Sequence, residues 1–446
     1  MKKQFLIIFL LTIVNGQAQI KGNFKFLAGQ ELELIGYNNF RTEVLSVTSV
    51  DSLGNFTLVY PNTYKGMAIL KAKDKSSLAF ILTETGLKIT GLNLKLKDSI
   101  EFVNSKENND FVQYFEDYKQ RQKALFSWHY LKDKYQNYEV LKKQNSILKN
   151  INEESNRIEK EDTNYLNALD KETYVSWFLP LKKLVSDMPI ITRHKKEQIP
   201  NVIEQFRRID FNNPKFKTSG LLKDLIDGHY LLLENSSQSL DSIYIQMNKS
   251  TDFLLDNLTK NETLLNEAGD YLFNYLEKRS LFKSSEYLAV QLLSINGCVL
   301  EDKLANKLEA YRKLKLGNTA PDIIFSDRTK LSSIASAKLL VFGASWCSKC
   351  KEDALKLKAY YNSWKQKGVS VVYVSIDTDK TDFENTYSNV PWKTDCDFKG
   401  WDSQVVKNYH VFATPTYFML DKDLKIILRP KSVEQANSWI NSKHKL

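Results

Sequence analysis

At 446 residues the chain is too long for a single ordinary domain, and its length suggests about three domains. The sequence is 42% hydrophobic and 12% aromatic, which is enough to build packed cores and excludes an intrinsically disordered protein. The formal charge is +10, but the 63 basic and 53 acidic residues are interspersed, without the basic blocks of nucleic-acid-binding proteins. We expect a well-solvated basic surface and no nucleic-acid partner; a weak attraction to anionic membrane or cell-wall polymer is the alternative.

The first residues have the pattern of a secretory signal peptide. A positive start, Met1–Lys3, precedes a short apolar run, Phe5–Val14, and the small residues of Gly16–Ala18 mark a cleavage site. The run is too short to span a bilayer, and no cysteine stands at the cleavage point as a lipoprotein would need. We expect a signal peptide over residues 1–18 and an exported mature chain without a transmembrane segment.

Residues 19–105 alternate short β-rich runs with turn residues, at the spacing of a small antiparallel β-sandwich. The runs are Gly22–Phe26, Glu31–Leu34, Asn55–Tyr60 and Met67–Leu70. Because the stretch carries no catalytic motif, we expect a β-rich binding or spacing domain.

Residues 106–315 have a helical pattern throughout. Four aromatic residues follow helical spacing, which places them on one helix face: Phe111, Tyr114, Phe115 and Tyr118. We expect an all-α domain of several packed helices, with breaks at four prolines: Pro180, Pro189, Pro200 and Pro214. The aromatic stripes are expected to be bundle core rather than ligand contacts.

The C-terminal part, residues 316–446, contains a C-x-x-C pair, Cys347 and Cys350, between an apolar run and a helical segment. One helical turn brings two such thiols close enough for a disulfide, and a helix N-terminus favours the thiolate of the first. The pair fits a reversible redox switch, but by itself it also fits half of a zinc site. The chain has only 4 cysteines and 5 scattered histidines, with no second C-x-x-C, so we expect no metal.

Two further segments complete a series of predicted strands and helices whose order matches that of a known fold. A β-branched run at Val369–Ile376 suits a buried parallel strand, and Thr414–Pro415 introduces another strand. The order of strand, C-x-x-C helix, strand, helix, Thr-Pro strand, strand and final helix resembles the thioredoxin fold. The closest resemblance is to its extracytoplasmic TlpA-like family of thiol–disulfide oxidoreductases. It covers roughly Leu316 to the C-terminus and implies an α/β thioredoxin-like domain over residues 316–446.

The β-rich region resembles the small β-domain that precedes thioredoxin domains in secreted proteins of some Gram-negative bacteria. The expected architecture is therefore multidomain, with an N-terminal antiparallel β-sandwich-like domain, a central all-α domain and a C-terminal thioredoxin fold. Together with the signal peptide, the resemblance implies a location in the periplasm of a Gram-negative cell envelope.

The resemblance also implies roles for the residues around the cysteine pair. Cys347 would be the partly exposed nucleophile with a depressed pKa, and Cys350 the resolving thiol, so that the two form the redox-active disulfide. Thr414–Pro415 matches the loop that faces the cysteines, where the bond before proline is cis and the preceding residue pairs with substrate. Trp346 is expected to lie over the pair as a lid that contacts substrate, with a core tryptophan as the alternative.

Charged residues beside the pair are expected to influence the ionisation of the two thiols. Lys349 stands where most relatives carry proline, and its charge would favour thiolates unless it is simply a solvated surface lysine. The acidic residue that thioredoxin places on the strand before the motif is replaced here by Val341. TlpA-like relatives place a glutamate shortly after the second cysteine, a position held here by Asp353. A partly buried Asp353 with a raised pKa would act as general base for Cys350, with Glu352 as the alternative.

The two remaining cysteines are interpreted as packing residues. Cys396 would be either a free buried thiol, which we favour, or a third redox thiol that relays disulfides. Cys298, in the helical region, is expected to be a core residue.

These observations predict an enzyme, a periplasmic thiol–disulfide oxidoreductase that reduces disulfides of exported proteins and needs no cofactor. Its partners would be protein thiols and disulfides of the cell envelope, and a membrane electron donor would recharge it. A peroxiredoxin-type peroxidase is a second hypothesis, but Ala344 stands where that chemistry needs Thr or Ser. The third is an envelope binding or scaffold protein whose redox domain is regulatory or vestigial.

Overall fold

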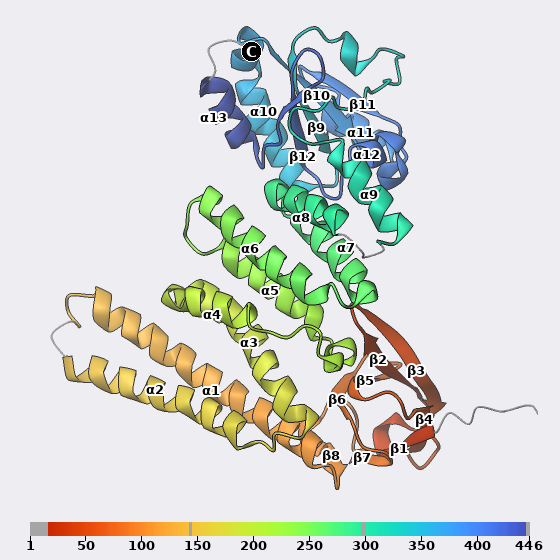
Figure 1. Ribbon diagram of the computed structural model, residues 1–446, viewed down its shortest axis with the longest axis vertical. Coiled ribbons are helices and arrows are strands. Elements are labelled where there is room, and N and C mark those ends of the chain that lie inside the picture. Colours follow the sequence, from red (N-terminus) through yellow and green to blue (C-terminus); the bar gives the residue numbers. More distant parts are fainter. Residues whose placement is uncertain (1–16, 142–144, 296–299, 443–446) are drawn as a thin grey trace, which may run out of the picture. The chain divides into compact units, whose positions relative to one another are not determined.

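The computed structural model describes residues 17–141, 145–295 and 300–442. Its elements run from strands through helices to a mixed α/β region, which confirms the predicted three-part layout (Figure 1). By its internal contacts the chain forms two compact units, Met1–Ser236 and Ser237–Leu446. The division falls inside the helical region, so the last four long helices belong to the same unit as the C-terminal α/β region. Within the described residues, no helix is both long and apolar enough to cross a membrane.

The N-terminal region is a sandwich of two four-stranded sheets, in the orders β4-β1-β7-β8 and β3-β2-β5-β6. The strands are β1 (Gln17–Phe24), β2 (Glu31–Asn38), β3 (Arg41–Ser49), β4 (Asn55–Pro61), β5 (Gly66–Ala72), β6 (Ser77–Leu82), β7 (Leu87–Gly91) and β8 (Glu101–Val103). Side chains from both sheets alternate inward and form one core. The prediction of a sheet-rich domain is confirmed, but β1 and β7 pair in parallel, which alternation of hydrophobic residues cannot reveal. Residues 1–16 of the predicted signal peptide lie outside the described residues. Its last two residues, Gln17 and Ala18, instead begin strand β1, and Ala18 is buried in the sandwich core, so the predicted boundary after Ala18 falls inside a strand.

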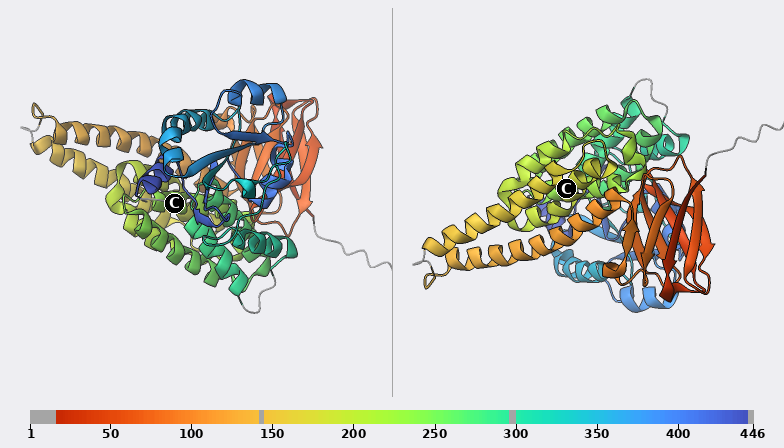
Figure 2. Two further views of the ribbon diagram at one scale, coloured as in Figure 1. Left: turned by 90° about the horizontal axis from the view of Figure 1, so that it is seen from above. Right: turned by 90° about the horizontal axis from the view of Figure 1, so that it is seen from below.

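Among its described residues, the first unit also contains five α-helices: α1 (Lys106–Asn137), α2 (Asn145–Ala168), α3 (Tyr174–His194), α4 (Ile199–Phe206) and α5 (Leu221–Glu234). The first two lie side by side as a long hairpin (Figures 1 and 2). Phe111, Tyr114 and Tyr118 are buried, as expected of bundle core.

Two of the four predicted helix breaks are wrong. Pro200 lies in the first turn of α4 and Pro214 begins a short 3₁₀ segment, as prolines at helix starts do. Pro180 and Pro189, however, lie inside α3, which continues through both. Each proline ring faces solvent while buried neighbours such as Phe178 hold the helix in place, so packing offsets the lost backbone hydrogen bonds.

The second unit begins with α6 (Leu240–Leu258), α7 (Glu262–Lys278), α8 (Phe282–Ser294) and α9 (Asp302–Arg312). Asparagine and serine caps start two of them: Ser239 accepts from the amide of Ser242, and Asn261 from that of Leu264. Helix α8 packs against α6, α7 and α9. Cys298, predicted to be a core residue, lies outside the described residues.

A five-stranded sheet in the order β11-β10-β9-β12-β13 forms the C-terminal region. Its elements are β9 (Ala337–Gly343), α10 (Ser348–Gln366), β10 (Val369–Ser375), α11 (Lys380–Tyr387), β11 (Lys393–Cys396), α12 (Gln404–Asn408), β12 (Thr416–Leu420), β13 (Ile426–Leu428) and α13 (Val433–Ser442). β9 to β11 run parallel, and β12 and β13 are antiparallel to their neighbours. Separate hydrophobic cores cover the two faces.

The pairing of β12 with β9 decides which two loops lie at the same end of these strands. β12 runs antiparallel to β9, and its first residue, Thr416, lies opposite Phe342 near the end of β9. The loop before β12 and the loop after β9 therefore lie at the same edge. Those loops carry Thr414–Pro415 and Cys347.

Candidate active site around the Cys347–Cys350 pair

Cys347 and Cys350 are joined by a disulfide at the start of α10, with their Cα atoms 5.2 Å apart. Cys347 is the N-cap residue of this helix, and its sulfur accepts a hydrogen bond from the backbone amide of Cys350 at 3.1 Å. The local sequence explains the geometry, because a single helical turn separates the two residues. The first sulfur thus lies where free helix N–H groups point, which favours a thiolate once the disulfide is reduced.

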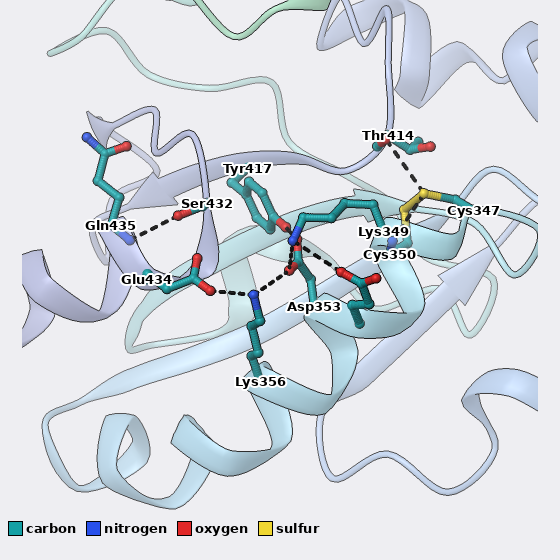
Figure 3. Close-up of polar contacts among 11 residues, drawn as sticks. Cys347, Lys349, Cys350, Asp353, Lys356, Thr414, Tyr417, Ser432, Glu434 and Gln435 are labelled. Atoms are coloured by element: carbon teal, nitrogen blue, oxygen red, sulfur yellow. Dashed lines mark hydrogen bonds and ion pairs between the residues drawn. A yellow bond between two sulfur atoms is a disulfide. The ribbon is translucent and has the colours of Figure 1, made fainter. Parts of the chain in front are cut away.

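Cys347 is more buried than the sequence analysis predicts. Its exposed fraction is only 8%, because the loop before β12 lies over its sulfur. The carbonyl oxygen of Thr414 is 3.6 Å from Cys347 Sγ (Figure 3). The Thr414–Pro415 bond is cis, as the resemblance implies.

Trp346 is 58% exposed, so the alternative of a core tryptophan is wrong. A second exposed tryptophan, Trp401, lies next to it with ring centroids 6.5 Å apart. Trp401 comes from the 3₁₀ turn Gly400–Asp402, and the sequence analysis gave it no role. The two rings form an apolar surface directly beside the cysteine pair.

Asp353 is 2% exposed and is held by three partners (Figure 3). The hydroxyl of Tyr417 donates to one carboxylate oxygen, and Lys349 Nζ lies 2.9 Å from the other. Lys356 Nζ lies 3.6 Å from that second oxygen and also binds Glu434. Burial and the hydrogen bond to Asp353 raise the pKa of Tyr417, which keeps the phenol protonated as a donor. Two ammonium groups and a phenol therefore stabilise the carboxylate.

Lys349 is exposed, as the alternative of a surface lysine expects, but its ammonium pairs with two carboxylates. It lies one helical turn before Asp353 and forms ion pairs with Asp353 and, at 3.6 Å, with Glu352. Figure 3 shows its side chain folded over the helix surface toward the carboxylate. Glu352, the alternative general base, is itself exposed. Of the two acids, Asp353 is the buried one.

Asp377 supports the loop that leads into the cysteine pair, a role that the sequence analysis missed. The buried carboxylate accepts from the amide of Ser345 at 3.1 Å, from its hydroxyl at 2.7 Å and from the hydroxyl of Ser375 at 2.6 Å. Its position just beyond the end of strand β10 was the available signal, because the ends of parallel strands meet at one edge.

Cys396 is a free, buried cysteine, as favoured from the sequence. Its sulfur lies 3.4 Å from the carbonyl oxygen of Asp377 and 3.4 Å from the amide of Phe398. Burial raises the pKa of this thiol to about 11, so it stays protonated at neutral pH. A protonated thiol is a poor nucleophile, which argues against a relay role.

His410, close to the Thr414–Pro415 loop, should make the stability of this unit pH-dependent. Burial lowers its pKa to about 4, with help from the charges of Lys307 and Arg429. Between pH 6.5 and pH 4 the unfolded chain binds a proton at this residue and the folded chain does not, so stability falls as the pH falls. We expect a loss of about 2 kcal/mol over this range, allowing for partial exposure.

The measurement is the free energy of unfolding at pH 7 and pH 4.5 for the wild type and His410→Asn. Asparagine suits the positive φ of 45° at this position. The variant should lose less stability than the wild type on acidification. Equal losses in both proteins would show that His410 does not contribute.

Comparison with known proteins agrees with this geometry. Residues 337–426 match a family model described as thioredoxin-like. The C-terminal domain is thioredoxin-like. The chain is 26% identical over 151 residues to the thiol-disulfide oxidoreductase ResA of Bacillus cereus, a match that covers 32% of this chain and 84% of that protein. It is 29% identical over 168 residues to ResA of Bacillus anthracis, covering 34% and 93%.

Among solved structures, a thiol-disulfide oxidoreductase from Bacteroides fragilis is 25% identical and covers 28% of this chain and 98% of its own, with a TM-score of 0.26. The sequence relatives support a thiol–disulfide oxidoreductase, and the predicted resemblance is confirmed. Because these matches involve about a third of the chain, their support concerns the thioredoxin-like domain.

Proposed function

We propose that this protein is an exported thiol–disulfide oxidoreductase that reduces disulfides of proteins in the cell envelope through Cys347 and Cys350. The observation that carries the proposal is a disulfide at the N-terminus of α10, with the cis Thr414–Pro415 loop over its first sulfur. The signal-peptide pattern supports export to the periplasm. A membrane-bound dithiol donor would recharge the pair.

The reaction runs in two exchange steps. In the reduced protein, the Cys347 thiolate attacks one sulfur of a partner disulfide, and the other partner sulfur leaves as a thiolate that takes up a proton. Cys350 then loses its proton and attacks Cys347 Sγ, which breaks the mixed disulfide and releases the second partner thiol. Two electrons pass to the partner, and the Cys347–Cys350 disulfide seen in the structure forms.

Substrate binding is proposed for the surface around Cys347. The backbone of Thr414 lies beside the attacking sulfur, with its carbonyl oxygen 3.6 Å from Cys347 Sγ, and an extended partner segment would pair with this backbone. Trp346, with Trp401 beside it, offers an apolar contact for residues that flank the partner's cysteine.

The decisive test is the reduction of insulin by the chain from residue 19 onward, driven by dithiothreitol. Faster turbidity than with dithiothreitol alone supports the proposal, and no acceleration would refute it. The reduction potential of the pair, measured against glutathione, then decides the direction. A potential as low as that of thioredoxin, about −270 mV, fits a reductase, whereas one near −120 mV fits an oxidant.

Asp353 is proposed to take the proton from Cys350 in the second step. It is the buried carboxylate one helical turn beyond Cys350, with its charge balanced by Lys349 and Lys356. Asp353→Asn should slow the resolution of the mixed disulfide on the order of 10²-fold, because general base catalysis is lost. Stopped-flow decay of a mixed disulfide formed with a chromogenic thiol measures this step.

Glu352→Gln is the matched control, since it removes an exposed acid from the adjacent position. Alkylation of reduced Cys347 by iodoacetamide should proceed at the same rate in both variants. If Asp353→Asn and Glu352→Gln resolve the mixed disulfide equally fast, Asp353 is not the base.

A further inference from the structure

The loop that carries Thr414 and Pro415 is held on a second side by helices of its own compact unit. Two residues before Thr414, the ring of Phe412 packs edge-on against Phe273 of α7, with centroids 6.1 Å apart. Lys307 of α9 places its ammonium 5.4 Å from the centroid of the Phe412 ring. All of these residues lie within Ser237–Leu446.

Lys307 is fixed in this position by its own partners. Its Nζ lies 2.6 Å from Asp270 Oδ1 and 2.7 Å from Asn274 Oδ1, both on α7. The same ammonium lies 5.0 Å from the centroid of the Phe273 ring. The cation is therefore held between two aromatic rings, one from α7 and one from the loop, an arrangement that favours cation–π attraction.

A buried ion pair connects the strands that follow the loop, β12 and β13, to the same two helices. Arg429, the residue after β13, donates to Glu277 of α7 at 3.1 Å and to the hydroxyl of Tyr311 on α9. Its guanidinium also lies 5.0 Å from the ring centroid of Phe418 on β12. Tyr311 packs edge-on against His410, with centroids 6.3 Å apart. The start of the loop and the hairpin that follows it are thus tied to the same two helices.

We infer that α7 and α9 set the position of the Thr414–Pro415 loop, and that Lys307 and Phe412 are positioning residues for the substrate disulfide. The inference rests on the proposed function. The Thr414 carbonyl lies 3.6 Å from Cys347 Sγ, so a shift passed along two residues from Phe412 changes the geometry in which a partner meets the sulfur. The helices α7 and α9 would then belong to the substrate site and not to a spacer.

The test is Lys307→Met in the chain from residue 19 onward, which keeps an unbranched apolar side chain and removes the charge. The KM for insulin should rise about two- to fivefold, the effect that loss of one cation–π contact implies, with kcat unchanged. The reduction potential of the Cys347–Cys350 pair should not move. Hydrogen exchange should accelerate at the amides of residues 412–414 and of Thr416.

Two companion variants separate positioning from general damage. Lys303→Met removes an exposed lysine from the preceding turn of α9 and should match the wild type. Lys307→Arg keeps a cation over the rings, so its KM for insulin should stay close to that of the wild type. A site that had simply unfolded would not show this difference between Lys307→Arg and Lys307→Met. If Lys307→Met equals Lys303→Met in KM and in hydrogen exchange, the inference is overturned while the proposed function stands. If the wild type fails to reduce insulin, the proposed function and this inference are both wrong.

Discussion

Cys347→Ser should abolish the reduction of insulin, leaving no more than the rate of dithiothreitol alone. The substitution replaces the attacking sulfur with a hydroxyl that is not ionised at neutral pH, so the first exchange step cannot occur. The fold should survive, because the serine oxygen can still cap α10 by accepting from the amide of Cys350. Insulin turbidity, together with circular dichroism, measures both effects.

Cys350→Ser gives the complementary result. The first step remains, but no thiol is left to resolve the mixed disulfide, so the variant should accumulate covalently bound partners. Non-reducing gels of the pre-reduced variant mixed with insulin in the absence of dithiothreitol would show these adducts, and dithiothreitol added afterwards would release them. Cys396→Ser is the matched control and should keep full activity, since that thiol is buried and protonated at neutral pH. Retained turnover by Cys347→Ser would contradict the proposed chemistry.

Glu277→Gln should destabilise the second unit by about 3–5 kcal/mol, the cost of leaving a buried charge without its partner. The side chains of Arg429 and Glu277 are only 7% and 2% exposed, and glutamate also accepts from Ser285 and Tyr311. The amide of glutamine keeps the shape but cannot neutralise the guanidinium. Hydrogen exchange of the most protected amides in β12 measures the change in unfolding free energy.

Two comparisons make this prediction specific. Asp241→Asn breaks an exposed ion pair with Lys283 and should cost less than about 1 kcal/mol. The double variant Glu277→Gln with Arg429→Met should be more stable than the sum of the single effects predicts, because neither charge is then buried alone. Strictly additive losses would show that the two side chains do not depend on each other.

The interpretation of the helical region changes with these contacts. From the sequence, residues 106–315 formed one helical domain, with a binding or scaffold role as the alternative. In the structure, the division between compact units falls at Ser236, and α7 and α9 contact the loop beside the cysteine pair. The last part of the helical region thus supports the thioredoxin-like domain directly, whereas a role for α1 to α5 stays a prediction.

The sequence by itself determined the features that depend on neighbouring residues. The resemblance to the thioredoxin fold implied that the Thr414–Pro415 loop faces the cysteines. The spacing of Cys347 and Cys350 by itself predicts a pair at a helix start, and Thr414–Pro415 before an apolar run predicts a loop that opens a strand. Both depend on local geometry, because a helical turn and a proline act over a few residues. The periodicity of apolar residues likewise distinguished strands from helices over most of the chain.

Only the tertiary structure decided which distant side chains meet. Asp353 is separated from Tyr417 by 64 residues and Glu277 from Arg429 by 152, and no spacing rule links such positions. The same holds for the parallel pairing of β1 with β7 and for the continuation of α3 through Pro189. In each case long-range packing sets the outcome, because the free energy of burying side chains and pairing buried charges exceeds the local preference of the backbone.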